Sequence, residues 1–307
     1  MYVYPDQLIS YLDVLFKNIQ DGVLKSGFFI FEWNKYIGKT TYLLDKIPNL
    51  LWDYMYHDFL HIRDLSDEWL ILKESNPKMT GTHHVLRVEA PKDEDIKLSD
   101  GTIYKDLGVR ELNDWLTTLP YGRFKIILIE NIERLNISWA NALLKTFEEP
   151  ADGVFIFATC SNKNRVLSTI LSRGFLVHFP AIDEYNMSKL LSTMDIQDMD
   201  SDFLIKISMG RPGLLHRFVS NKNYHVLYKF LKSLDLHESS MITDLHMQFV
   251  QINKIGLLDI ALEIITLLYI KDKHVTDSIM ETIQFLEANM NTSNVLYNLL
   301  TQLRYSK

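Results

Sequence analysis

Short apolar runs alternate with helical patterns through the first part of the chain. The runs are four or five residues long and almost free of polar side chains, which is typical of strands buried on both faces of a parallel sheet. Segments with apolar residues at helical spacing separate them. This alternation predicts a parallel sheet covered by helices on both faces. The expected strands are residues 28–31, 59–62, 126–129, 154–158 and 175–179.

Two segments depart from this alternation. Residues 66–105 are polar and contain an acidic run at 93–95, so we interpret them as an insertion, with a hairpin inside it. Helical patterns then resume at 107–119 and 138–149. After Pro180 the strand pattern stops, and only amphipathic helical patterns follow, which favours antiparallel helix packing. The chain is therefore predicted to have an α/β domain, a small helical lid and a helical C-terminal domain.

Composition narrows the class of protein only slightly. Hydrophobic residues make up 47% and charged residues 23%, as in ordinary globular proteins. A net charge of −7 argues against a protein that binds nucleic acid with its whole surface. Cys160 is the single cysteine, so no intrachain disulfide can form, and we find no secretory signal and no run long enough to span a membrane. We expect a cytoplasmic location.

The loop after the first apolar run carries part of a phosphate-binding motif. In the pattern Gly-x-x-x-x-Gly-Lys-Thr, the last three positions are Gly38, Lys39 and Thr40, but Trp33 stands at the first glycine and Tyr36 lies inside the loop. Glycines are needed there because the backbone must approach the phosphates closely. The candidate nucleotide-binding residues are Gly38, Lys39, Thr40 and Thr41. The alternative is a loop that has lost nucleotide and only begins the next helix.

The end of the strand at 126–129 carries the second half of such a site in altered form. Glu130 and Asn131 stand where a hydrolytic enzyme would have an aspartate for Mg²⁺ and a glutamate that orients water. Because an asparagine amide cannot act as a base, these residues predict the loss of hydrolysis.

Histidines are the remaining candidates for chemistry. His57 and His61 are four residues apart, and His83 and His84 follow, but a spacing of four does not bring two side chains together in a strand. We therefore expect no metal site. Cys160 follows an apolar strand and is interpreted as a small buried hydrophobe.

Three blocks in the middle of the chain resemble the bacterial clamp-loader subunits of the AAA+ family. Residues 141–150 read Asn-Ala-Leu-Leu-Lys-Thr-Phe-Glu-Glu-Pro, close to that family's Asn-Ala-Leu-Leu-Lys-Thr-Leu-Glu-Glu-Pro. Residues 155–160 are similar to the strand that ends in the family's sensor threonine. Residues 167–173 resemble its Leu-x-Thr-Ile-x-Ser-Arg-Cys segment, with Gly174 in place of the cysteine.

Within that family the delta-prime type is the better match. Its phosphate loop is often degraded while its Ser-Arg pair is kept, and residues 210–213, Gly-Arg-Pro-Gly, resemble its lid motif. The family's four-cysteine zinc module is missing, since Cys160 stands alone. The resemblance thus implies an AAA+ domain over residues 1–180, a lid over 181–221 and a collar (oligomerisation) domain over 222–307.

The resemblance also implies a function. The chain would be a delta-prime-like subunit of the DNA polymerase III clamp-loader complex, hence part of a DNA-directed DNA polymerase holoenzyme. Its partners would be gamma/tau and delta subunits, the sliding clamp and primed DNA, with no membrane contact. Arg173 would act in trans as an arginine finger and Thr159 would be the sensor residue.

By the same resemblance, we expect no ATP hydrolysis by the chain itself, no zinc and no resident cofactor, although ATP with Mg²⁺ is what an intact loop would bind. Three alternatives stay open: an ATP-hydrolysing gamma/tau-like subunit, a stand-alone P-loop kinase, and a scaffold in which Arg173 only pairs with a surface carboxylate.

Overall fold

The computed structural model describes most of the chain outside the segment around residues 52–122. The described residues are 6–51, 58–62, 70–74, 85–89, 105–107, 112–113, 116–117, 123–135, 137–196, 198–235, 242–288 and 290–305. The chain divides into two compact units, residues 4–181 and residues 182–307. Each unit has its own core of buried apolar side chains.

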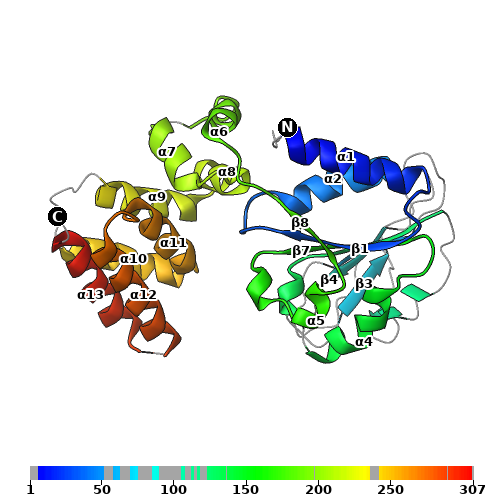
Figure 1. The fold of residues 1–307 in the computed structure, drawn as a ribbon. Coiled ribbons are helices and arrows are strands. Elements are labelled where there is room, and N and C mark those ends of the chain that lie inside the picture. Colours follow the sequence, from blue (N-terminus) through cyan, green and yellow to red (C-terminus); the bar gives the residue numbers. More distant parts are fainter. Residues whose placement is uncertain are drawn as a thin grey trace. The chain divides into compact units, whose positions relative to one another are not determined.

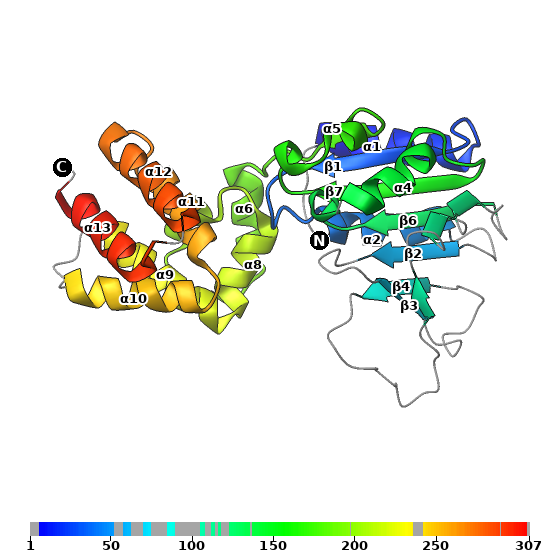
Figure 2. The same ribbon diagram turned by 90° about the horizontal axis from the view of Figure 1, so that it is seen from below.

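The first unit is built on one eight-stranded sheet, whose order is β5-β3-β4-β2-β6-β7-β1-β8. Strands β2, β6, β7, β1 and β8 are all parallel, as the apolar runs predict, and Figure 2 shows β1, β7, β6, β2 and β4 in this sequence across the sheet. The bounds are β1 Gly27–Glu32, β2 Asp58–Ile62, β3 Leu70–Glu74, β4 Val85–Glu89, β5 Lys105–Leu107, β6 Lys125–Ile129, β7 Val154–Cys160 and β8 Phe175–His178.

The segment expected to be an insertion contributes strands to one edge of the sheet. β4 is parallel to β2, and β3 runs antiparallel to both β4 and β5. The antiparallel pair β3–β4 is the pairing that the hairpin interpretation predicts. Leu107, expected to begin a helix, ends β5 instead, while residues 112–113 and 116–117 are helical.

Helices cover both faces of the sheet, with α1 (Asp6–Gln20) and α2 (Lys39–Leu51) on one face and α4 (Ile137–Glu148) on the other (Figure 1). Because side chains alternate along a strand, β1 contributes to both cores. Phe28 stacks on Phe147 of α4 at 4.4 Å between ring centroids. On the opposite face Phe29 stacks on Phe157, which also contacts Phe16 of α1. Burial of these apolar strands on both faces is the main stabilising contribution.

Short helical turns follow β6 and β7. A 3-10 turn, η1 (Ile132–Arg134), follows β6, and a second, η2 (Lys163–Arg165), follows β7. The short helix α5 (Ser168–Leu171) then leads into β8. β8 is the last strand at its edge of the sheet and, in the part of the chain that the structure describes, pairs only with β1.

The second unit is helical. Asp183 and Asp200 begin α6 and α7 as N-caps, each accepting a backbone N–H with its carboxylate, and Pro212 opens α8, where a missing N–H has no cost. None of the described helices is long and apolar enough to cross a membrane. The bounds are α6 Glu184–Leu191, α7 Ser201–Ser208, α8 Pro212–Ser220, α9 Lys222–Asp235, α10 Ile242–Lys254, α11 Leu258–Leu268, α12 Lys273–Glu287 and α13 Thr292–Tyr305.

Candidate functional site

The carboxyl ends of β6, β7 and β1 bring the expected nucleotide residues together. These strands are neighbours in the sheet, with Ile129 beside Ala158 and Phe31 beside Thr159. The phosphate-type loop follows β1, Asn131 follows β6, and Thr159 lies near the end of β7. In a parallel sheet this edge is where ligands usually bind.

Lys39 is folded back into the loop that precedes it. Its side chain is 7% exposed, and its ammonium group donates to the backbone carbonyl of Trp33 and to that of Asn34 at 3.1 Å. The loop is held in a strained form, because Tyr36 has φ 69°, a left-handed conformation that disfavours side chains. Gly38 has φ 95°, which glycine adopts readily. Of the other candidates, Thr40 is half-buried and Thr41 is exposed.

Trp33, which replaces the first glycine, lies against the neighbouring strand. Its ring meets His178 of β8 edge-on at 4.3 Å between centroids, and its backbone N–H donates to the carbonyl of Cys160. His178 in turn lies 2.9 Å from the Glu32 carboxylate. The indole therefore packs on the rim of the loop and belongs to a polar cluster at the end of β1.

Asn131 and Thr159 are bonded to each other. The backbone N–H of Asn131 donates to the Thr159 hydroxyl at 3.2 Å, and Thr159 is 3% exposed. Asn131 has φ 55° and ψ 55°, a left-handed conformation that asparagine tolerates better than most residues. The structure thus places the expected sensor residue beside the position where a base would stand.

Glu133 is a member of this site that the sequence analysis missed. One carboxylate oxygen accepts from the backbone N–H of Ser161 at 2.9 Å, and the other is buried with no hydrogen-bond partner among the described residues. Burial, and secondarily the charge of Glu133, raises the pKa of the neighbouring Cys160 thiol to about 12. No spacing in the sequence indicates Glu133, because η1 alone turns it towards β7.

These residues fit a nucleotide only in part. Lys39 and Thr40 could face phosphates if the ammonium group exchanged its loop carbonyls for phosphate oxygens, which requires the loop to open. Asn131 offers an amide where hydrolysis needs a carboxylate. The residue set therefore does not support hydrolysis at this loop.

Arg173 lies at the opposite end of the sheet from the loop. It follows α5 and precedes β8, whose Phe175 is paired with Phe29. The four residues along β1 from Phe29 to Trp33 separate the level of Phe175 from the loop by about 13 Å, at ~3.3 Å per residue, and Arg173 precedes Phe175 on the side away from the loop. Its guanidinium contacts Glu148, the last residue of α4, with 2.9 Å between Nε and Oε2.

Gly174 allows the backbone next to Arg173 to approach β1 closely. A Cβ at this position would lie 2.5 Å from Cδ1 and 2.7 Å from Cγ1 of Ile30, which is fully buried. The chain therefore crosses closely over β1 just after Arg173, and a side chain there would displace it. This close approach gives a physical reason for glycine where the resembling family has cysteine.

Arg211, in the lid motif, is committed to an ion pair inside the second unit. Its side chain is 4% exposed, and its two terminal nitrogens donate to the two carboxylate oxygens of Glu263 in α11, one at 3.0 Å. Pro212 begins α8 directly after it. The structure thus gives Arg211 an architectural contact.

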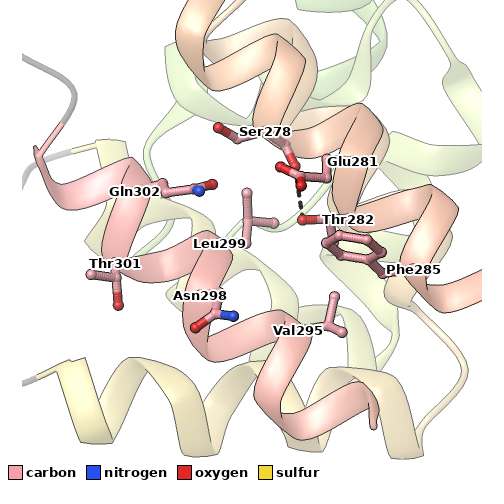
Figure 3. A pocket seen from close by; sticks show the side chains of 9 residues that line it. All are labelled: Ser278, Glu281, Thr282, Phe285, Val295, Asn298, Leu299, Thr301 and Gln302. Carbon is pink, nitrogen blue, oxygen red and sulfur yellow. Dashed lines mark hydrogen bonds between the residues drawn. The ribbon is translucent and has the colours of Figure 1, made fainter. Parts of the chain in front are cut away.

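A pocket of about 280 Å³ between α12 and α13 is the other cavity of note (Figure 3). Phe285, Val295 and Leu299 form its apolar part, and Glu281 is its carboxylate. The hydroxyls of Ser278 and Thr282 donate to helix carbonyls, which leaves no activated nucleophile among them.

The described residues contain no group of three or more acidic, histidine or cysteine side chains that could hold a metal ion. His61 lies in β2, as predicted, whereas His57, His83 and His84 fall outside the described residues. The expectation of no metal at those histidines therefore remains a prediction.

The first unit is similar in sequence to known proteins. A family model described as "DNA polymerase III, delta subunit" matches residues 71–183. The DNA polymerase III subunit tau/gamma of Haemophilus influenzae is 33% identical over 115 residues, which are 36% of this chain and 17% of that protein. The subunit delta' of the same organism is 28% identical over 115 residues, which are 36% of this chain and 35% of that protein.

The sequence similarity extends over only part of each of the curated relatives, and this chain spans well under half of their length. Among these curated proteins the matched part spans as little as 12% of the relative's length, in the tau subunit of Escherichia coli, and 37% in the gamma subunit of Buchnera aphidicola. A gamma subunit-related protein of Thermotoga maritima aligns with 96% of this chain and 99% of its own, at a TM-score of 0.46 and 17% identity. Over its matched residues, the chain is thus similar to subunits of DNA polymerase III of both the tau/gamma and the delta' type.

Proposed function

We propose that the chain is a delta-prime-like subunit of the clamp-loader complex, and that Arg173 completes the ATP site of a neighbouring subunit. In this proposal the chain hydrolyses no ATP itself and holds no zinc. It assembles with gamma/tau-type and delta-type subunits in the cytoplasm and helps them to load the sliding clamp on primed DNA.

The position of Arg173 is the observation that carries the proposal. Arg173 precedes β8 at the amino end of the strand, about 13 Å or more along the sheet from the loop, and its guanidinium is bonded to Glu148, away from a phosphate bound at the loop. An arginine in that place is suited to a site outside its own α/β unit. A guanidinium brought to a neighbour's ATP would stabilise the charge that develops on the transferred phosphoryl group.

The surface around Arg173 supports a contact with another subunit. Phe175 is 63% exposed and Leu176 is 47% exposed, directly after Arg173 and on the edge strand of the sheet. Exposed apolar side chains on an edge strand favour association, and an arginine beside them is a common combination at interfaces. We propose that the neighbouring subunit which receives Arg173 also covers these two side chains.

The chain's own loop supports the absence of hydrolysis. Asn131 replaces the carboxylate that orients water, and the ammonium group of Lys39 is bonded to the loop's own carbonyls. A delta-prime-like subunit needs neither group for catalysis, because its contribution is made at a neighbour's site.

Replacing Arg173 in a reconstituted complex tests the proposal. The wild-type chain, the Arg173→Ala variant and the Arg173→Lys variant would each be assembled with their partner subunits. ATP turnover would then be measured with clamp and primed DNA. Loss of an arginine finger costs roughly 10³-fold or more at the affected site, so turnover there should nearly vanish in both variants. Full assembly with unchanged turnover and unchanged clamp loading would show that Arg173 is idle and favour the scaffold alternative.

A gamma/tau-like ATPase is the second candidate function, because tau/gamma relatives match as well as delta' relatives do. It predicts that the isolated chain binds Mg²⁺-ATP tightly and that Lys39→Ala abolishes this binding. We expect instead weak or undetectable binding by calorimetry, and the same complex turnover for Lys39→Ala as for the wild type.

A further inference from the structure

Three acceptors surround the guanidinium of Arg173. Its Nε donates to Oε2 of Glu148 at 2.9 Å, and its Nη1 donates to the backbone carbonyl of Thr169 at 2.8 Å. The Ser172 hydroxyl lies 3.4 Å from the same Nη1. Within the described part of the chain, Nη2 makes no hydrogen bond, so one end of the fork is open to an acceptor from outside.

The ion pair between Arg173 and Glu148 contributes little to the folding stability of the chain. The Glu148 side chain is 58% exposed and that of Arg173 is 27% exposed, and ion pairs at such surfaces contribute little to folding. The effect of this ion pair is to fix the conformation of the Arg173 side chain. An arginine side chain has several rotatable bonds, and bonds at both Nε and Nη1 restrict it to the conformations that leave Nη2 outermost.

The supports of these contacts are rigid. Glu148 ends α4, whose inner face is packed on the sheet through Phe147 and Leu143, both 1% exposed. Thr169 lies in α5, and Ile170 beside it is fully buried. Gly174 ties the other side of Arg173 to β1 by its close approach to Ile30. Backbone and carboxylate are thus both held by buried elements while the guanidinium stays accessible.

We propose that Glu148 is a positioning residue for Arg173: it holds Nε so that Nη2 is presented in advance to the phosphate of a neighbouring subunit's ATP. This inference rests on the proposed role of Arg173. Orienting a charged group before the partner arrives lowers the entropy that must be lost at the moment of reaction, and displacement of a reacting group by about 1 Å costs up to a hundredfold in rate. On binding, Glu148 keeps its bond to Nε while the phosphate takes Nη2.

Glu148→Gln in the reconstituted complex is the central test, because glutamine keeps the length of the side chain and removes its charge. Glu149→Gln is the matched control: Glu149 is the adjacent carboxylate, it is exposed, and the hydrogen bonds and ion pair of Arg173 go to Glu148, Thr169 and Ser172 instead. The neighbouring subunit that receives Arg173 keeps its phosphate-loop lysine. In the other ATP-binding subunits this lysine is replaced by alanine, so that only one ATP site remains active. We expect kcat at the remaining site to fall roughly ten- to hundredfold for Glu148→Gln with KM for ATP little changed, and neither value to change for Glu149→Gln.

A second background separates this inference from the proposed function. In a chain that already carries Arg173→Ala, adding Glu148→Gln should cause no further loss, because there is no finger left to position. If Arg173→Ala lowers turnover while Glu148→Gln behaves like the control, positioning by Glu148 is refuted and the finger stands. If Arg173→Ala has no effect, the proposed function itself fails. Equal additional losses in both backgrounds would show that Glu148 acts on folding or assembly.

Discussion

Arg211 and Glu263 join the start of α8 to the middle of α11 by a two-pronged ion pair between residues 52 apart in sequence. The pair is asymmetric, because the arginine side chain is 4% exposed and the glutamate side chain is 39% exposed. It ties the lid motif to the helices that follow it within one compact unit. An arginine held in this way is not available to a phosphate unless the pair breaks.

Because only the arginine is buried, we expect removal of Glu263 to lower the free energy of unfolding more than removal of Arg211. Glu263→Ala leaves a buried guanidinium without its carboxylate, and after allowance for the exposed side of the pair this should cost about 2 kcal/mol. Arg211→Met leaves an apolar side chain in the same space and a glutamate that water can reach, at a cost of about 1 kcal/mol or less. Thermal unfolding should therefore show Tm lower by about 5–10 °C for Glu263→Ala and by only a few degrees for Arg211→Met. Equal shifts for the two variants would contradict the asymmetry.

The close approach of Gly174 to Ile30 predicts that a side chain at position 174 clashes, and that shortening Ile30 relieves part of the clash. In Gly174→Ala the new Cβ would meet Cδ1 of Ile30 at 2.5 Å, so we expect destabilisation of about 1–3 kcal/mol from overpacking. Ile30→Val removes that methyl group, and the double variant should recover part of the loss. Chemical denaturation of the two single variants and the double variant measures the coupling. Strictly additive losses would show that the two residues do not interfere.

Cys160 should be almost inert while the chain is folded. Because burial raises the pKa of its thiol to about 12, the thiolate fraction at pH 8 is on the order of a hundred- to thousandfold below that of an ordinary cysteine. A raised pKa means that its contribution to stability is complete below about pH 9 and is lost as the pH rises towards 12. Alkylation at pH 8, with and without denaturant, checks this expectation. Labelling of the native chain at the rate of the unfolded chain would be incompatible with a buried thiol.

The lowered pKa of the Asp200 carboxyl predicts that the folded chain loses stability in acid. The Lys232 ammonium group, at 2.6 Å, and the backbone N–H of Phe203 hold the pKa of this carboxyl below its usual value. Because the folded-state pKa is lowered, the contribution is present above about pH 4 and is lost as the pH falls through the lowered value. Asp200→Asn should therefore flatten the dependence of Tm on pH below about pH 4.

Much of the first unit is predictable from the sequence because its strands are read from local composition. The apolar runs at 28–31, 126–129 and 154–158 lie within β1, β6 and β7, and the pattern at 138–149 corresponds to α4. A short, fully apolar run is most stable when it is buried in a sheet. The period and composition of the sequence are therefore enough to predict these strands. The same reasoning fails at Leu107, where an apolar residue beside polar ones fits a helix or an edge strand equally well.

The contacts of the candidate sites were decided by tertiary structure alone. Sequence determined that Arg173, Thr159 and the loop at Lys39 are the residues of interest, because each lies in a recognisable block of fixed order. It did not indicate Glu148 beside Arg173 or Glu263 beside Arg211, pairs separated by 25 and 52 residues. Such pairs depend on how whole helices pack, and a surface carboxylate carries no local signal of the partner it will meet. The parallel strand order, which puts Arg173 and Lys39 at opposite ends of one sheet, is likewise a property of the assembled fold and of no single segment.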